Sequence, residues 1–349
     1  MSTLPPVRLA PDYDIPPLIK GGWQLAGGHG VVSADAAIAD MTAFADAGIT
    51  AFDCADIYTG VEELIGHFLR HWRTARGSDA PAIRVHTKCV PDLDRLSTLS
   101  RRDIEAIIDR SLRRLGVERL DLVQFHWWDY AIPGAVDAAL HLRDLEQAGK
   151  IHHLGATNFD TAHITAMLDA GVPLITHQVQ VSVLDGRALR DMAALCLSRG
   201  MRLLCYGTLA GGFLHERWLG APEPMPPLEN RSLVKYKLII GDFGGWTLFQ
   251  RLLQQLHAIA LAHGTTIGAI AIRHVLDQPA VAAAIVGARS TAHLAPTLAA
   301  TQFALSVTEH EALSTLLSTA TGPTGDVYAL EREKGGRHAS IMRYNLNTT

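Results

Sequence analysis

The chain has 349 residues, 48% of them hydrophobic, and a formal net charge of −4. This length suits one α/β barrel, which runs to about 250 residues or more with insertions. The absence of a basic tract argues against a nucleic-acid partner, and no run reaches the roughly 18 apolar residues of a membrane span. The first residues lack a signal-peptide pattern, and the four cysteines show no C-x-x-C spacing, so we expect a cytoplasmic protein with reduced thiols.

Short apolar runs alternate along the chain with longer segments of helical periodicity. In chain order, the runs expected to form strands are 18–21, 50–53, 83–87, 120–125, 151–156, 174–178, 202–206 and 282–286. The segments expected to form helices are 33–47, 62–72, 101–115, 134–148, 161–170, 188–199, 247–263 and 291–305. Near-continuous apolar strands are typical of a parallel sheet buried on both faces. Eight β-then-α units predict a closed (β/α)8 TIM barrel.

Three segments lie outside this repeat. Residues 7–16 precede the first barrel strand, and we expect them to form a small hairpin that closes the bottom of the barrel. Residues 207–245 form a long loop after the seventh strand, and loops of this length are usually functional. The polar carboxy-terminal tail could be a lid or a frayed end. We therefore expect one domain over residues 1–349, with a barrel core at about 17–305 and an extension at 306–349.

Four reactive side chains stand at or just after the ends of three predicted strands: Asp53, Tyr58, Lys88 and His126. Active sites of parallel barrels lie at the carboxyl ends of the strands, so we expect these side chains to converge. Together they could protonate a carbonyl oxygen while a hydride arrives at its carbon. A phenol with a pKa near ~10 is a poor acid at neutral pH. We therefore expect Lys88 to lower the pKa of Tyr58, and Asp53 to hold the lysine charged and in place.

A series of different short motifs lies between about Gly21 and Ser290, spaced like the successive units of a barrel. They are Asp53-Cys-Ala-Asp-Ile-Tyr58, Thr87-Lys88, Asp121-Leu-Val-Gln-Phe-His126-Trp127-Trp128, Gly155-Ala-Thr157-Asn158-Phe159, Gln178, Tyr206-Gly-Thr-Leu209-Ala-Gly211-Gly212 and Gly287-Ala-Arg289-Ser290. Each motif is weak alone, but the ordered set resembles the aldo-keto reductase family. The resemblance implies a barrel enzyme that reduces aldehyde or ketone carbonyls with a nicotinamide cofactor extended across the barrel mouth.

The resemblance also implies roles for the reactive side chains. Tyr58 would donate the proton during reduction, and Lys88, paired with the aspartate, would lower the pKa of its phenol. His126 would orient the carbonyl or assist proton transfer. An ordinary loop tyrosine and a hydrogen-bonded core histidine are the alternatives for Tyr58 and His126. The second alternative is what we expect for most of the 17 histidines, including His152 and His153.

Other matching residues would hold the cofactor. We expect contributions from Gly22, Trp23, Asp53, Thr157, Asn158, Gln178, Tyr206, Gly207, Leu209, Gly211, Gly287, Arg289, Ser290 and His293. Amide and hydroxyl groups among these residues can form hydrogen bonds with the carboxamide of the nicotinamide. Tyr206 would stack on the nicotinamide ring. Backbone without side chains at the glycines can approach the pyrophosphate of the cofactor. An arginine before a helix amino terminus suits the 2′-phosphate of NADP. We expect NADP(H), with NAD(H) possible because His293, Pro296 and Thr297 replace the usual adenosine-end side chains.

The substrate pocket is expected to be walled by aromatic rings. Trp23, Trp127 and Trp128 would suit an apolar or aromatic carbonyl compound, with simple core packing as the alternative. No metal is expected, because His67 and His71 lack the glutamate of an H-E-x-x-H motif. We expect a small-molecule carbonyl or alcohol as the partner, with no nucleic acid or membrane. The sequence leaves the oligomeric state open.

Two other functions fit the same scaffold. One is the reverse reaction, catalysed by an NAD-dependent sugar or alcohol dehydrogenase, which the altered adenosine-end residues favour. The other is a regulatory subunit that binds cofactor without turnover, as some members of the family do on a membrane channel. The four reactive side chains favour an enzyme over the regulatory subunit.

Overall fold

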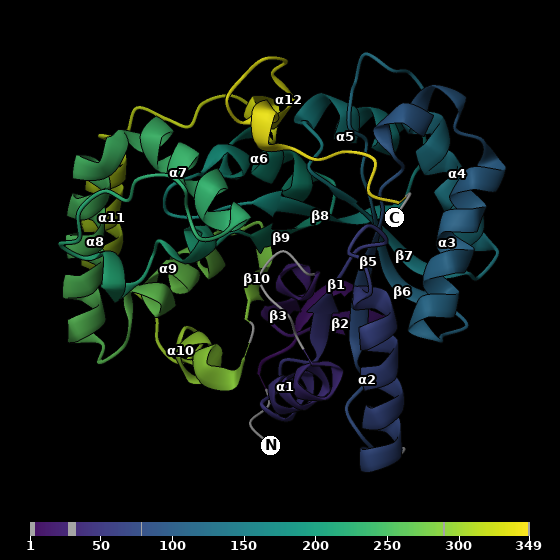
Figure 1. Cartoon of the computed structure of the whole chain (residues 1–349), viewed down its shortest axis with the longest axis horizontal. Coiled ribbons are helices and arrows are strands. Elements are labelled where there is room, and N and C mark those ends of the chain that lie inside the picture. The colour runs from purple at the N-terminus through teal and green to yellow at the C-terminus, as the bar shows by residue number, and fades with distance from the viewer. Residues whose placement is uncertain (1–3, 27–32, 78, 289, 348–349) are drawn as a thin grey trace.

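A computed structural model describes residues 4–26, 33–77, 79–288 and 290–347. At its centre, eight parallel strands close into a barrel in the order β10-β3-β4-β5-β6-β7-β8-β9 (Figure 1). The strands are β3 (Leu18–Gly21), β4 (Ala51–Asp53), β5 (Arg84–Cys89), β6 (Leu120–Phe125), β7 (Ile151–Thr157), β8 (Leu174–Gln180), β9 (Arg202–Tyr206) and β10 (Val281–Gly287). The predicted (β/α)8 fold is therefore confirmed.

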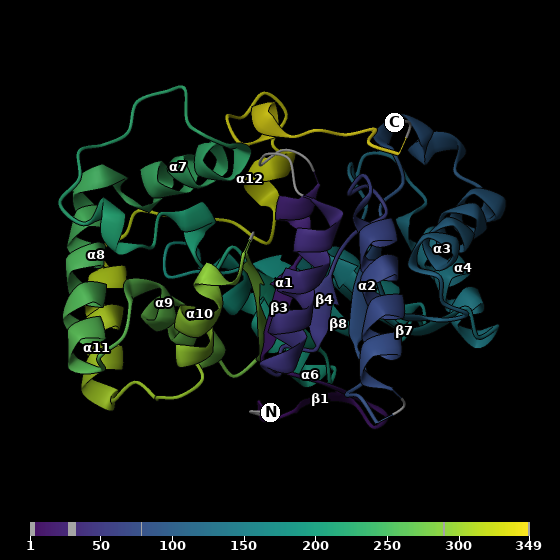
Figure 2. The same cartoon turned by 60° about the horizontal axis from the view of Figure 1, so that its bottom comes forward.

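Helices pack around the outside of the barrel (Figures 1 and 2). They are α1 (Ala34–Asp46), α2 (Val61–Arg76), α3 (Arg101–Leu115), α4 (Ala135–Gln147), α5 (Thr161–Asp169), α6 (Asp191–Ser198), α7 (Arg231–Phe243), α8 (Gly245–Ala262), α9 (Ile267–Leu276), α10 (Leu294–Ala299), α11 (Val307–Leu317) and α12 (Ala329–Arg332). Helix α3 illustrates the local signals: Ser100 and Asp103 form a capping box at its start, and Gly116 ends it with φ 66°.

The predicted amino-terminal hairpin is present and closes one end of the barrel. Strand β1 (Val7–Ala10) pairs antiparallel with β2 (Tyr13–Ile15). Tyr13 is fully buried, and it packs in one apolar cluster with interior residues of the barrel such as Leu122 and Leu204. Because these contacts are made at the amino-terminal ends of the strands, the carboxyl ends form the open mouth.

The segment after β9 is largely helical rather than a long loop. It carries the 3-10 helices η4 (Ala210–Gly212) and η5 (Glu216–Trp218) and then α7, so the prediction of a loop over 207–245 is only partly right. Helices α7, α8, α9 and α11 gather on one side of the barrel (Figure 2), around a second apolar core that includes Phe213 and Phe249. This core explains the helices, because an amphipathic face needs a partner to bury it.

Two helices near the end of the barrel differ from the prediction. Helix α9 was not expected: its apolar residues are rich in β-branched Ile and Val, and a short buried run of this kind resembles a strand in sequence. The helix expected over 291–305 stops at Ala299, and α11 begins after a separate capping box of Ser306 and Glu309. In the described ranges no single helix is long and apolar enough to span a membrane. Helices α8 and α9 together have the length and composition of a span, but the chain bends by 93° between them.

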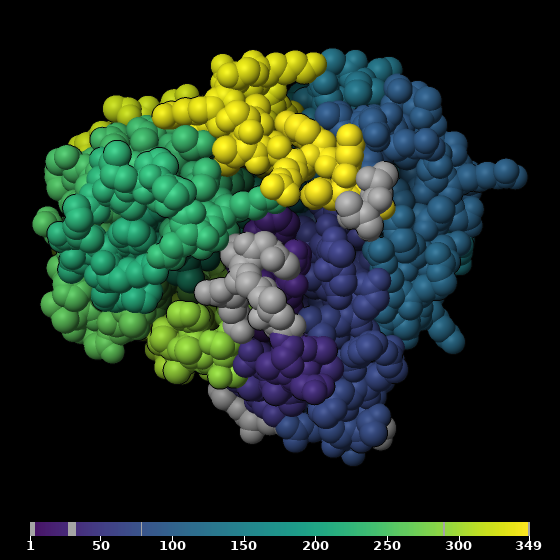
Figure 3. All heavy atoms as spheres, in the orientation of Figure 1, coloured from purple at the N-terminus to yellow at the C-terminus, as the bar shows by residue number. Residues whose placement is uncertain are grey.

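The carboxy-terminal extension is folded and lies across the barrel mouth. Figure 3 shows it as a band that runs from the side of α7 and α8 to the side of α3 and α4. Its Val327, Tyr328, Glu331 and His338 are buried. The alternative of a frayed end is therefore wrong, and the extension forms part of the surroundings of the site.

Candidate active site

Asp53 and Lys88 form a buried ion pair at the ends of neighbouring strands β4 and β5. The Nζ atom of Lys88 donates to the two carboxylate oxygens of Asp53 at 2.9 and 2.8 Å and to the carbonyl oxygen of Cys54 at 2.7 Å. The side-chain amides of Gln124 and Gln178 donate to Oδ1 of Asp53 at 3.2 and 2.6 Å. Both charged side chains are only 7% exposed. Such a pair is stable only when its hydrogen bonds are satisfied, as they are here.

Tyr58 lies beside this pair, in the turn between β4 and α2 (Val61–Arg76). The ammonium of Lys88 lies 5.2 Å from the centre of the phenol ring, and the Trp23 ring packs edge-on at 5.1 Å. Burial raises the pKa of Tyr58 well above its usual value, and the negative charge of Asp53 adds to the rise. Burial and Asp53 therefore decide the sign, so the pKa of Tyr58 is raised overall, whereas we expected Lys88 to bring it below its usual value.

His126 follows strand β6 and is buried. Its Nδ1 lies 2.9 Å from the carbonyl oxygen of Thr157. A carbonyl only accepts, so Nδ1 carries the proton and Nε2 of the neutral ring is an acceptor. Nε2 has no hydrogen-bond partner among the residues that the structure describes. Burial, followed by the positive charge of Arg332, lowers the pKa of His126 to about 3, so the ring is neutral at physiological pH.

The residues expected to hold a carboxamide converge on the same end of the barrel. Gln178 reaches Asp53, and the hydroxyl of Thr157 donates to the carbonyl oxygen of Gln178 at 3.2 Å. Asn158 has a left-handed backbone (φ 61°), and its Oδ1 accepts from the hydroxyl of Tyr206 at 2.9 Å. Strands β4, β7, β8 and β9 are thus linked by side chains around one mouth, and the role of these residues in holding a carboxamide stays a prediction.

The glycines after β9 are explained by close contact with helix α7. Gly207 and Gly211 have left-handed backbones with φ 76° and 64°, and a Cβ atom at either would lie 2.0 or 2.7 Å from the side chain of Tyr236. Leu209 packs against the second apolar core. These positions therefore need glycine for packing, independently of any pyrophosphate.

Close packing also explains two glycines at the ends of β3 and β10. A Cβ atom on Gly22 would lie 2.6 Å from the carbonyl oxygen of Asp53, and one on Gly287 would lie 2.0 Å from the side chain of Gln24. The backbone after β3 can therefore pass close to β4 only with glycine at position 22, whereas at Gly287 the flexible side chain of Gln24 could move aside.

The predicted phosphate-binding turn is only partly described. Arg289 lies outside the described residues. Ser290 precedes the 3-10 helix η6 (Thr291–His293), where His293 leads into α10. Sequence reasoning missed Lys20, which is buried on β3 and donates to the carbonyl oxygen of Ala288 at 3.0 Å beside this turn. Burial lowers the pKa of Lys20 to about 8.

The three tryptophans lie in different environments. Trp127 is 1% exposed and its Nε1 donates to the carbonyl oxygens of Asp129 and Ile132, so it belongs to the core rather than to a pocket wall. Trp128 packs edge-on against His126 at 4.4 Å and lines a cavity of about 340 Å3. Trp23 contacts Tyr58. Trp127 is thus excluded from a pocket wall by its burial, and a substrate wall formed by Trp23 and Trp128 stays a prediction.

Sequence reasoning also missed Arg332, in the carboxy-terminal extension. Its guanidinium donates to the carbonyl oxygens of Trp127 at 2.7 Å, Trp128 at 3.3 Å and Asn158 at 2.7 Å. It also lies 4.1 Å from the ring centre of Tyr130. This one side chain therefore joins the loops after β6 and β7. The tail has no motif that could have predicted such a contact.

A buried ionic cluster anchors the extension next to Arg332. The carboxylate of Glu331 lies 3.4 Å from both Arg187 and Lys235, and Arg187 also pairs with Asp185 at 2.8 Å. Lys235 lies 5.4 Å from the ring centre of Tyr206. The extension is thus tied by charge to the end of β9, where Tyr206 faces the mouth.

Comparison with known proteins places this geometry in context. The model of the Aldo/keto reductase family matches residues 17–318. A chloroplastic pyridoxal reductase of Arabidopsis thaliana is 28% identical over 266 residues, which cover 72% of this chain and 68% of that protein. Flagellar radial spoke protein 5 of Chlamydomonas reinhardtii is 29% identical over 64% of this chain, but the match spans only 49% of its own length. A glycerol dehydrogenase structure from Gluconobacter oxydans superposes with a TM-score of 0.75 at 25% identity, covering 92% of this chain and 97% of that one.

Proposed function

The chain belongs to the aldo/keto reductase family, and on this premise we propose that it is an NADP(H)-dependent oxidoreductase that interconverts a carbonyl group and an alcohol. The observation that carries the proposal is the buried Lys88–Asp53 pair beside Tyr58, with His126 at the next strand end. When bound, the nicotinamide supplies the hydride to the carbonyl carbon or takes it from the alcohol carbon. The carboxamide and hydroxyl groups of Thr157, Asn158 and Gln178 have the chemistry to hold that ring.

In this proposal Tyr58 exchanges the proton with the substrate oxygen. Its raised pKa keeps the phenol protonated at neutral pH, and an alkoxide is a far stronger base than a phenolate, so transfer to the developing alkoxide is favourable. The ammonium of Lys88 near the ring stabilises the phenolate that remains. Asp53 keeps this ammonium in position.

His126 has a narrower role than the resemblance implies. As a neutral ring with the proton on Nδ1, it can accept a hydrogen bond at Nε2 but cannot donate one there. It therefore suits the hydroxyl group of an alcohol better than the oxygen of a carbonyl. A second candidate function is an alcohol dehydrogenase, in which Nε2 of His126 accepts the single hydroxyl proton of the substrate, because the protonated phenol of Tyr58 cannot take it. The similarity to a glycerol dehydrogenase structure is consistent with it.

The test is a direct comparison of the two directions with both cofactors. The full chain is mixed with NADPH or NADH and a panel of aldehydes, ketones and quinones, and with NADP or NAD and a panel of alcohols and sugars. We expect the highest kcat/KM with NADP(H). A preference for NAD(H) would overturn the cofactor assignment, and cofactor binding without turnover on either panel would support the regulatory function instead.

Two tyrosine variants test the proton donor. Tyr58→Phe should lose turnover by about 10²-fold or more, because general acid catalysis is lost, while cofactor binding measured by fluorescence titration stays within about threefold of wild type. Tyr13→Phe is the matched control, since it removes a buried phenol at the closed end of the barrel. An equal loss of binding and turnover in Tyr58→Phe would contradict the role assigned to Tyr58.

A further inference from the structure

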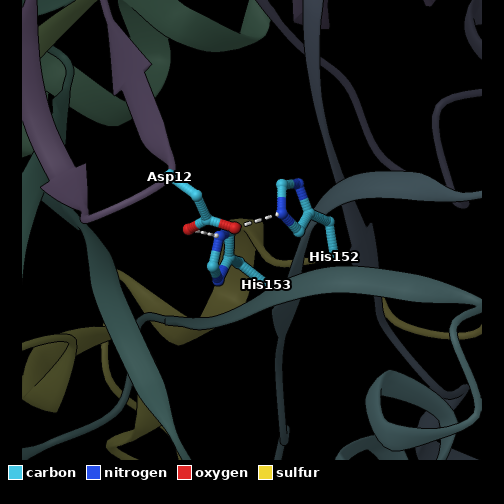
Figure 4. Close-up of side chains that lie close together, drawn as sticks. All are labelled: Asp12, His152 and His153. Carbon is cyan, nitrogen blue, oxygen red and sulfur yellow. Dashed lines mark hydrogen bonds and ion pairs between the residues drawn. The ribbon is translucent and has the colours of Figure 1, made fainter.

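Three side chains with metal-binding atoms meet at the closed end of the barrel, opposite the mouth. Asp12 lies in the turn between β1 and β2, and His152 and His153 are at the start of β7 (Figure 4). The Nε2 atoms of His152 and His153 lie 2.8 and 3.0 Å from the two carboxylate oxygens of Asp12. One ligand atom from each of the three residues lies within 4.8 Å of the others. The arrangement therefore brings two imidazoles and one carboxylate around a single point.

This set of ligands is suited to one class of ion. Imidazole nitrogen with carboxylate oxygen binds Zn²⁺ and neighbouring divalent transition metals, at about 2.0–2.2 Å from each ligand atom. In a tetrahedral site such bond lengths place the ligand atoms about 3.3 Å apart. Each imidazole lies 2.8 or 3.0 Å from one carboxylate oxygen, and the three ligand atoms lie within 4.8 Å of one another, so modest side-chain shifts would reach these separations.

The cluster is held in place but remains accessible. The two imidazoles are 15% and 14% exposed, stack on one another at 4.2 Å, and pack edge-on against Tyr13 at 5.6 and 5.1 Å. The Asp12 side chain is 59% exposed, so an ion can enter from solvent and keep water as its further ligands.

We propose that Asp12, His152 and His153 form a binding site for one divalent transition-metal ion, with Zn²⁺ as the best fit. The ion would connect the amino-terminal hairpin to strand β7 at the closed end. Binding moves the proton of each imidazole from Nε2 to Nδ1, and Nδ1 of His152 is buried without a hydrogen-bond partner in the described part of the chain. With three protein ligands and this cost, the affinity should be lower than that of a four-ligand structural zinc site.

The experiment uses the full chain, stripped with a chelator and dialysed. Titration with ZnCl2, followed by calorimetry, should give one Zn²⁺ per chain and a higher Tm, because the ion binds only the folded arrangement. Addition of CoCl2 should give the intense visible absorption of tetrahedral Co²⁺ with nitrogen ligands. This measurement on the wild-type chain needs no variant and so does not depend on a variant that folds.

The variants separate metal binding from hydrogen bonding. Glutamine can still donate to Asp12 from its amide, so His152→Gln and His153→Gln keep the contact with the hairpin but lose the ligand. Each should weaken Zn²⁺ binding at least tenfold and remove the Co²⁺ band. Asp14→Asn is the matched control: Asp14 lies in the same hairpin but pairs with Arg8, and its loss should leave binding unchanged.

A second control measures background binding elsewhere on the chain. His67 and His71 are exposed four residues apart on α2, a spacing that can hold a metal ion weakly. A variant with both changed to glutamine should keep the stoichiometry of the wild type. The proposal is overturned if Zn²⁺ binding is unchanged in His153→Gln, if it is lost in the variant of α2, or if the wild-type chain binds no Zn²⁺ at 100-fold excess. In each case the cluster is only a hydrogen-bonded contact.

Discussion

The charged groups at the two ends of the barrel differ in burial. At the mouth, Asp53 and Lys88 are almost completely buried, and each hydrogen bond that they need is supplied by neighbouring strands. At the closed end, Asp12 is exposed and the imidazoles of His152 and His153 meet it from a strand terminus. A buried pair is costly to disturb but controls chemistry strongly, whereas an exposed cluster is easily rearranged and open to ions.

The carboxy-terminal extension adds further charge to the mouth. Glu331 is buried and Arg332 half-buried there, and their partners Arg187 and Trp127 lie 144 and 205 residues away in the sequence. The hairpin at the other end contributes mainly apolar residues such as Tyr13 and Ile15. The contrast predicts that substitutions at the mouth have larger effects than those at the closed end.

The largest effect is expected for Lys88→Met. Removing one partner of a buried ion pair leaves Asp53 unpaired and should cost about 3–5 kcal/mol of unfolding free energy. Turnover should fall by about 10³-fold, within the usual range for loss of acid–base assistance. Urea unfolding and steady-state kinetics measure the two effects separately.

A double variant distinguishes stability from chemistry. Asp53→Asn combined with Lys88→Met replaces the ion pair with two neutral groups, so much of the lost unfolding free energy should return. Turnover should stay low, because the ammonium is still missing. Recovery of activity in the double variant would show that Lys88 has no chemical role.

The next effect in size is expected for Arg332→Leu. Three carbonyl oxygens lose a charged donor, so the unfolding free energy should fall by about 2 kcal/mol, and kcat should fall about tenfold as the loops after β6 and β7 shift. The pKa of His126 should rise from about 3 toward its usual value, because the charge of Arg332 is one cause of its lowering. Burial, the larger cause, remains, so the rise is partial, and the acid limb of the pH profile of kcat/KM should lie at a higher pH than in the wild type.

Arg337→Leu is the matched control for this prediction. Arg337 lies in the same extension, but its guanidinium is exposed and pairs with Asp242. We expect almost no change in kcat or in the pH profile. The same acid limb in both variants would mean that the extension acts through its overall charge rather than through the contacts of Arg332.

A third prediction concerns His86, which is buried inside the barrel near Tyr13. Burial lowers the pKa of His86 to about 3. Between pH 6.5, the ordinary pKa of histidine, and about pH 3, His86 binds a proton in the unfolded chain but not in the folded chain. The unfolding free energy therefore falls as the pH falls through this window, by up to about 1.4 kcal/mol per pH unit for this group.

His86→Leu removes this one contribution. Between pH 7.5 and pH 5 the variant should lose about 2 kcal/mol less than the wild type. Asp56 acts in the opposite direction, because burial raises its pKa to about 8 and the folded chain holds the extra proton below that pH. That contribution is the same in both proteins, so the difference between them isolates His86. Unfolding free energy is measured in urea at both pH values. If the variant and the wild type lose the same amount between pH 7.5 and pH 5, the lowered pKa of His86 is contradicted.

The fold was largely predictable from the sequence, and the reason is visible in particular strands. The bounds expected for β3, β6 and β9 match the structure, because these strands are short apolar runs buried on both faces. Asp53, Lys88 and His126 could be placed because a barrel has its active site at the carboxyl ends of its strands. The rule depends on local sequence alone.

The remaining features depend on packing that no local pattern encodes. The contact of Arg332 with Trp127 joins residues 205 apart in the sequence. The pKa of Tyr58 was predicted to fall and instead rises, because burial and the negative charge of Asp53 decide its sign. Helix α9 was missed because it is a short run rich in β-branched apolar residues, which local sequence cannot distinguish from a strand. The order of strands and helices can therefore be predicted from local sequence, whereas the pKa values and ion pairs of the site depend on contacts between distant residues.

The smallest effect is expected for Asp12→Asn in metal-free buffer. Asparagine keeps one oxygen to accept from an imidazole, and the site is exposed, so Tm should fall only slightly. Turnover should stay within twofold of wild type, because the cluster lies at the opposite end of the barrel from Lys88. Strand β7 nevertheless connects the two ends, with His153 near its start and Thr157 at its end. A severalfold change in kcat would therefore show that the strand transmits strain along its length and that the two ends are not independent.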